Sequence, residues 1–137
     1  MEFIQFLQGE LLLTGTLFAL IILLIVNIYS EKYRKYQVVD TNGAVSLMDD
    51  DELIIIDVRE EKERKAGFLS NDLNIPMGQV KAKMDSLDKS KNILVYCKSG
   101  TRSDRIADIL SKNDFQTVSS LNGGFNAWLK ADLPIQR

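Results

Sequence analysis

The one cysteine of the chain, Cys97, opens a short loop that also carries two cations. The loop reads CKSGTR from Cys97 to Arg102. Gly100 permits a tight curl of the backbone, and successive N–H groups in such a curl point inward and bind an anion. A thiolate at the mouth of this nest, beside Lys98 and Arg102, is stabilised and exposed, and is therefore a nucleophile. We predict that Cys97 is catalytic; a small buried cysteine at a strand end is the alternative.

The length of the loop and the absence of histidine narrow the chemistry. With no His in the chain, mechanisms in which His activates Ser or Cys are excluded, and no zinc site is expected. Cysteine-dependent phosphatases use a C-x5-R loop, whereas Cys97 and Arg102 form the shorter C-x4-R, which fits a smaller reacting atom such as a sulfane sulfur. A phosphatase or arsenate-reducing enzyme is therefore a disfavoured alternative, also because no second cysteine could resolve a disulfide.

Apolar runs and amphipathic segments predict the elements that position this loop. The runs LIII and NILVY are typical of strands buried on both faces of a parallel sheet. The predicted strands are 37–39, 53–56, 73–75, 92–96 and 117–121, and the predicted helices are 41–47, 78–87, 103–112 and 125–131. Strands that alternate with helices indicate an α/β domain on a mainly parallel sheet flanked by helices.

Sites in such sheets form beyond the carboxyl ends of the strands, where Asp57 and Cys97 both fall. The planar fork of Arg102 could pair with Asp57 across these strand ends and hold the loop rigid. Ser103 is the predicted N-cap of the following helix, whose N-terminus adds positive charge at the loop. The charged run 60–65 is interpreted as a solvated helix face.

A long uncharged segment precedes this domain. Residues 11–28 contain no charge and would span about 27 Å as a helix, close to the ~30 Å hydrocarbon core of a membrane. We predict a retained transmembrane helix at about 11–29 within a segment 1–30, a basic linker 31–36 and a domain 37–137. Lys32, Arg34 and Lys35 follow the span, so the domain is expected on the cytoplasmic side of the inner membrane. A buried soluble helix and a cleaved signal peptide are the alternatives.

The remaining charge is balanced. Residues 1–30 contain Glu2 and Glu10 and no Lys or Arg, so residues 31–137 hold all 17 basic residues and 17 of the 19 acidic ones. This neutrality gives no reason to expect nucleic acid as a partner. The single cysteine cannot form an internal disulfide, which fits a reducing compartment.

Three segments resemble the rhodanese family in their order and spacing, and the resemblance covers nearly all of residues 37–137. CKSGTRS at 97–103 is similar to the family's C-x-x-G-x-R-S active-site loop. IDVRE at 56–60 with NIP at 74–76, and LNGGFNAW at 121–128 with LP at 133–134, are similar to its other two signatures. The apolar span and its basic flank further resemble small membrane-anchored bacterial members. One departure is Phe68, which follows Gly67 where the family usually has His.

The resemblance implies a sulfurtransferase that needs no cofactor and no metal. Cys97 would take the outer sulfur of thiosulfate or a persulfide donor, become a persulfide, and pass the sulfur to a thiol or to cyanide. Asp57 and Arg59 are expected to support the site, while Gly123, Gly124 and Trp128 are expected to be structural. The expected substrate-binding residues are those of the loop: Lys98, Ser99, Gly100, Thr101, Arg102 and Ser103.

A module without turnover is the main competing hypothesis. A rhodanese fold could dock a membrane-protein complex with its cysteine incidental, and the predicted anchor favours such a partner. An anion nest together with Arg102 favours catalysis, because a docking module needs neither.

Overall fold

A computed structural model describes residues 1–137, which divide into two units, Met1–Arg34 and Lys35–Arg137. The first unit contains α1 (Glu2–Gly9) and α2 (Leu11–Lys32). α2 has 22 residues, none of them buried, and an 18-residue stretch of it has a mean hydropathy of 2.7. By length and composition it is sufficient to cross a membrane, a criterion that a signal sequence also meets. The helix continues past the predicted end at residue 29 and takes in Lys32.

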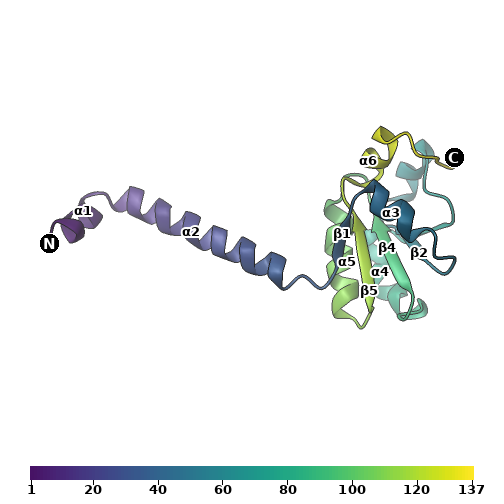
Figure 1. The fold of residues 1–137 in the computed structure, drawn as a ribbon, viewed down its shortest axis with the longest axis horizontal. Coiled ribbons are helices and arrows are strands. Elements are labelled where there is room, and N and C mark those ends of the chain that lie inside the picture. The colour runs from purple at the N-terminus through teal and green to yellow at the C-terminus, as the bar shows by residue number, and fades with distance from the viewer. The chain divides into compact units, whose positions relative to one another are not determined.

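The second unit is built on one parallel sheet of five strands (Figure 1). The strands are β1 (Gln37–Val39), β2 (Ile54–Asp57), β3 (Asp72–Asn74), β4 (Asn92–Tyr96) and β5 (Thr117–Leu121). Their order is β1-β5-β4-β2-β3, and every neighbouring pair is parallel. The predicted α/β class is thus confirmed. β4 is the central strand, so the chain that leaves it at Cys97 starts from the middle of the sheet.

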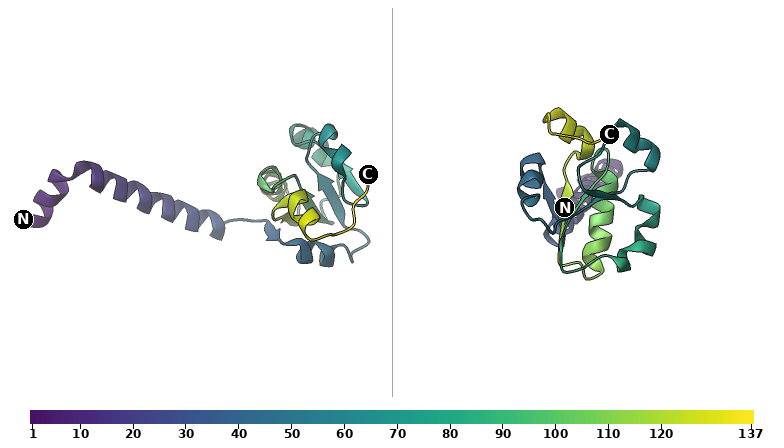
Figure 2. Two further views of the ribbon diagram at one scale, coloured as in Figure 1. Left: turned by 90° about the horizontal axis from the view of Figure 1, so that it is seen from above. Right: turned by 90° about the vertical axis from the view of Figure 1, so that its right-hand side faces the viewer.

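Helices cover both faces of this sheet (Figure 2). α4 (Val80–Lys83) and α5 (Thr101–Lys112) pack on one face, where Val80, Ile106 and Leu110 join a core with Ile56 and Val95. α3 (Thr41–Leu47) and α6 (Gly124–Lys130) pack on the other, through the residues Ala44, Phe125 and Trp128. The 3-10 helices are η1 (Glu61–Ala66), η2 (Met77–Gln79) and η3 (Met84–Ser86).

One predicted helix differs in kind from the observed structure. The single helix predicted for 78–87 is three short pieces, η2, α4 and η3, because i→i+3 hydrogen bonds from Gln79 to Pro76 and from Leu87 to Met84 tighten both ends. By contrast, α3 begins as predicted, since the Asp40 side chain accepts the N–H of Gly43 at 2.7 Å.

Candidate active site

The sulfur of Cys97 lies inside a curl formed by its own loop. It accepts a hydrogen bond from the backbone N–H of Gly100 at 3.0 Å and a second from that of Ser103 at 3.4 Å. Gly100 has φ +104°, a conformation that favours glycine, and α5 begins at the next residue. Two backbone donors and the N-terminus of a 12-residue helix therefore point at one sulfur atom.

Cys97 is fully buried, with 0% of its surface exposed, so the predicted exposed thiolate is wrong. Its burial follows from its position after the central strand and beneath its own loop, in which Lys98, Ser99 and Thr101 are the exposed residues. The sulfur is thus held among donors rather than displayed on the surface.

Ser103 is not the N-cap of α5. Gly100 occupies that position, and Ser103 lies in the first turn, where its hydroxyl donates to the Gly100 carbonyl at 3.0 Å. The Cys97 sulfur lies 3.6 Å from the Ser103 hydroxyl oxygen. The Ser120 hydroxyl oxygen lies 3.0 Å from that same Ser103 oxygen, and the Ser120 hydroxyl donates to Asp104 at 2.6 Å. A buried hydroxyl pair therefore links the loop to β5. In the sequence, the two serines inside the strand TVSSL are the feature that could have pointed to Ser120.

Gly124, which was expected to be structural, supports the loop from behind. Its φ is +57°, and a Cβ there would lie 2.4 Å from the Cys97 carbonyl oxygen and 2.7 Å from the carbonyl carbon of Lys98. The next two N–H groups, of Phe125 and Asn126, donate to the carbonyls of Cys97 and Lys98 at 2.8 and 3.0 Å. The start of α6 and the start of the loop are therefore in direct contact, which leaves no room for a side chain.

Arg102 does not pair with Asp57 as predicted. Its fork donates to both carboxylate oxygens of Glu63 on η1, at 2.8 Å each. This hydrogen-bonded guanidinium lowers the pKa of Glu63 to about 2. The loop is thus tied to η1 rather than to the end of β2, and Glu63 is a site residue that the sequence analysis placed in a solvated run.

The Glu63→Gln variant tests this tie. Since the pKa of Glu63 is depressed from 4.5 to about 2, the pair stabilises the fold above about pH 4.5 and loses that effect as the pH falls toward 2. Gln keeps the size of the side chain and an acceptor for the backbone N–H of Glu60. We expect it to lower the free energy of unfolding at pH 7 by about 1 kcal/mol, as for partly exposed ion pairs.

The measurement is urea unfolding of both proteins between pH 7 and pH 3, with Glu61→Gln as control because Glu61 is exposed on the same 3-10 helix. A deficit of the Glu63 variant that stays constant down to pH 3 would contradict the assignment.

Asp57 instead binds two arginines beneath the loop. Arg59 donates to its carboxylate from Nε at 3.0 Å and from Nη2 at 2.9 Å, and Arg64 donates at 2.7 Å. Arg64 also forks onto Asp72, at 2.7 and 2.9 Å. Arg59 is 2% exposed and Asp57 0%, so this ion pair is buried.

The fifth member of this network is Tyr96, the residue before Cys97. Its hydroxyl lies 3.0 Å from Asp57 Oδ2, contacts Asp72 Oδ2, and accepts the N–H of Leu69 at 3.1 Å. Burial, followed by the hydrogen bond with Asp72, raises the pKa of Tyr96, so the hydroxyl keeps its proton. Asp57 and Arg59 therefore act on the end of β4 through Tyr96.

Phe68 covers one side of this network. Its backbone forms a two-way bridge with Gln136, at 2.9 and 2.8 Å, and the guanidinium carbon of Arg64 lies 4.1 Å from the centre of its ring. Where a histidine would offer hydrogen bonds, the chain thus has a cation–π contact.

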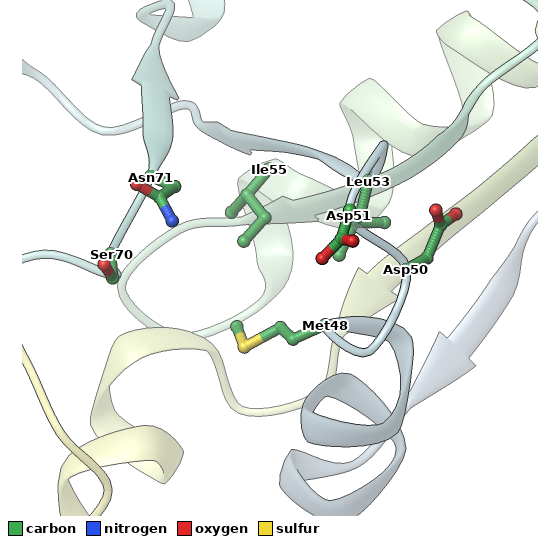
Figure 3. Close-up of a pocket in the computed structure, with 7 residues that line it drawn as sticks. All are labelled: Met48, Asp50, Asp51, Leu53, Ile55, Ser70 and Asn71. Atoms are coloured by element: carbon green, nitrogen blue, oxygen red, sulfur yellow. The ribbon is translucent and has the colours of Figure 1, made fainter.

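Two pockets open at opposite ends of the domain. At the carboxyl ends of the strands, a groove of about 390 Å³ lies beside the loop and is lined by Arg59, Lys62, Glu63, Lys65, Ala66, Lys98, Phe125, Asn126 and Leu129. Figure 3 shows the other, about 200 Å³, lined by Met48, Asp50, Asp51, Leu53, Ile55, Ser70 and Asn71. Apart from Ile55 in β2, its residues precede β2 or β3, so it lies at the amino ends of these strands. Its lining includes two aspartates and no cysteine.

Residues 41–131 match the Rhodanese-like domain family, and the chain belongs to that family. YtwF of Bacillus subtilis is 40% identical over 79 residues, which are 58% of this chain and 76% of YtwF. A protein of Allochromatium vinosum named sulfurtransferase is 30% identical, and the match covers 65% of this chain and 83% of that protein. Thiosulfate sulfurtransferase GlpE of Coxiella burnetii is 34% identical over 56% of this chain and 72% of its own.

Solved structures agree with the fold. The crystal structure of a rhodanese-related protein from Thermoplasma volcanium has a TM-score of 0.65 at 27% identity, and the match covers 74% of this chain and 98% of that one. The predicted family resemblance is thereby confirmed, and the chain is a relative of named sulfurtransferases.

Proposed function

We propose that this protein is a sulfurtransferase in which Cys97 carries a sulfane sulfur as a persulfide. The observation that carries the proposal is the sulfur atom at the end of the central strand, which accepts the N–H groups of Gly100 and Ser103 at the start of α5. Such donors stabilise a thiolate and, after transfer, the negative charge of the persulfide. The names of the relatives support the same reaction class.

The reaction takes two steps that use only the donor and the acceptor. The Cys97 thiolate attacks the outer sulfur of thiosulfate, the S–S bond of the donor breaks, and its electron pair leaves on sulfite. An acceptor thiolate or cyanide then attacks the outer sulfur of the persulfide, and the electron pair returns to Cys97 as the thiolate. A persulfide donor reacts in the same way, with its thiolate as the leaving group.

The loop residues divide this work. The backbone N–H groups of residues 98–103 bind the donor's anionic group, with Lys98, Ser99 and Thr101 on the exposed side. Arg102 positions the loop through Glu63, and Asp57 with Arg59 positions the strand end through Tyr96. Because Cys97 has no exposed surface, a local opening of the loop must precede each transfer.

We further propose that α2 is a membrane anchor. The basic residues after the apolar stretch then leave the domain at 37–137 in the cytoplasm at the inner membrane, joined by the linker 31–36. A membrane-bound donor, acceptor or partner protein would account for the tether.

The test is intact mass spectrometry of the full chain in detergent. Reduced protein treated with thiosulfate should gain one sulfur atom, which cyanide then removes, and Cys97→Ala should gain none. If neither thiosulfate nor any persulfide donor adds sulfur, the enzyme is excluded, and a docking module for a membrane complex becomes the better account.

A further inference from the structure

The groove beside the loop is larger than the proposed donors require. It runs between η1 and α6 and reaches the active-site loop at Lys98, the residue next to Cys97. Its volume of about 390 Å³ falls within the range of small-molecule sites, ~300–1,000 Å³. Thiosulfate and cyanide have only a few heavy atoms each, so neither fills it.

The free charges of this groove are all positive. Lys62, Lys65 and Lys98 line it, are exposed, and form no ion pair. The other two charged lining residues are already neutralised, Arg59 by Asp57 and Glu63 by Arg102. Three unpaired ammonium groups around one opening favour an anionic ligand.

The wall opposite the η1 lysines is apolar. Phe125 and Leu129 of α6 line it, and Phe125 is fixed because the Arg59 guanidinium carbon lies 4.4 Å from its ring centre. Leu129 is 43% exposed, so its side chain offers surface that a ligand could cover. The groove therefore combines an apolar wall with a cationic rim, as binding sites for amphipathic small molecules do.

We infer that this groove binds the sulfur acceptor, and that the acceptor is a low-molecular-weight thiol of about tripeptide size that carries carboxylates. The inference rests on the proposed sulfurtransferase function. Lys62 and Lys65 bind the carboxylates, Phe125 and Leu129 contact the aliphatic part, and the thiol reaches the loop at Lys98. Its thiolate attacks the outer sulfur of the Cys97 persulfide, the S–S bond breaks with its electron pair on Cys97, and the acceptor leaves as a persulfide.

Steady-state kinetics with thiosulfate as donor compare three acceptors: glutathione, which carries two carboxylates, the uncharged 2-mercaptoethanol, and cyanide. For the full-length double variant Lys62→Gln/Lys65→Gln, we expect the KM for glutathione to rise about tenfold, from two lost exposed ion pairs. The KM values for 2-mercaptoethanol and cyanide should stay within about twofold. In the wild type alone, added salt should raise the KM for glutathione.

The matched control is Lys81→Gln, because Lys81 is exposed on α4, which packs on the other face of the sheet. If the double variant changes the KM for glutathione and the KM for 2-mercaptoethanol equally, or changes neither, the inference is overturned.

A binding measurement separates this inference from the proposed function. Calorimetric titration with S-methylglutathione, which has no free thiol, reports the groove without any sulfur transfer. If S-methylglutathione binds in a way that depends on Lys62 and Lys65 but Cys97 takes no sulfur, the groove is an anion site and its role as acceptor site is rejected. If Cys97 takes sulfur but S-methylglutathione shows no binding that depends on these lysines, the groove is rejected as the acceptor site and the sulfurtransferase function stands.

Discussion

The Cys97→Ser variant is expected to lose sulfur transfer by a factor of at least about 10³, the scale seen when a covalent nucleophile is removed. Serine keeps the shape of the side chain and can accept the N–H groups of Gly100 and Ser103. The fold should therefore persist, and only the atom that carries the sulfane sulfur is exchanged. An alcohol at neutral pH is a poor nucleophile here, because the chain has no histidine to act as its base.

The measurement is thiocyanate formation from thiosulfate and cyanide by the full chain, with thermal unfolding as the check on folding. Ser90→Ala is a suitable control, since Ser90 is an exposed serine in the turn before β4 whose side chain bonds to Asp88. Turnover within tenfold of the wild type would mean that Cys97 does not carry the sulfur.

The Asp57→Asn variant is expected to lower the free energy of unfolding by about 3–5 kcal/mol, the cost of breaking a buried ion pair by removing one partner. The amide has nearly the same size but no charge, so Arg64 would keep Asp72 while Arg59 would lose its ion-pair partner. Arg59 is 2% exposed, so water cannot replace the lost carboxylate without opening the core.

Guanidinium chloride unfolding at pH 7 measures this difference. Asp108→Asn is the matched control, because Asp108 pairs with Lys112 on the exposed side of α5 and should cost less than about 1 kcal/mol. Similar losses for the two variants would show that the Asp57 network does not hold the fold together.

Both predictions concern the end of one strand. Cys97 follows Tyr96, whose hydroxyl contacts Asp57 and Asp72, while the carbonyl of Cys97 accepts the N–H of Phe125 in α6. Loss of Asp57 should therefore disturb the loop as well as the stability. The charge network and the sulfur site are adjacent parts of the same structure.

Much of the fold could be predicted because its signals are local. The runs at 92–96 and 117–121 matched β4 and β5 residue for residue, since a strand buried on both faces needs an unbroken run of small or apolar side chains. Gly100 likewise indicated a curl in the chain, and the structure has φ +104° there. The helix predicted for 78–87 failed because periodicity alone does not distinguish α from 3-10 turns.

The sequence by itself determined the α/β sheet, the loop after the central strand, the single thiol on it and the apolar N-terminal segment. Only the tertiary structure decided that Arg102 binds Glu63 rather than Asp57, that Cys97 is buried, and that three lysines from η1 and the loop surround one groove. Any carboxylate can satisfy an arginine fork, so the choice depends on which one the fold brings within reach. Glu63 and Arg102 are 39 residues apart, a distance over which no local pattern in the chain specifies a contact.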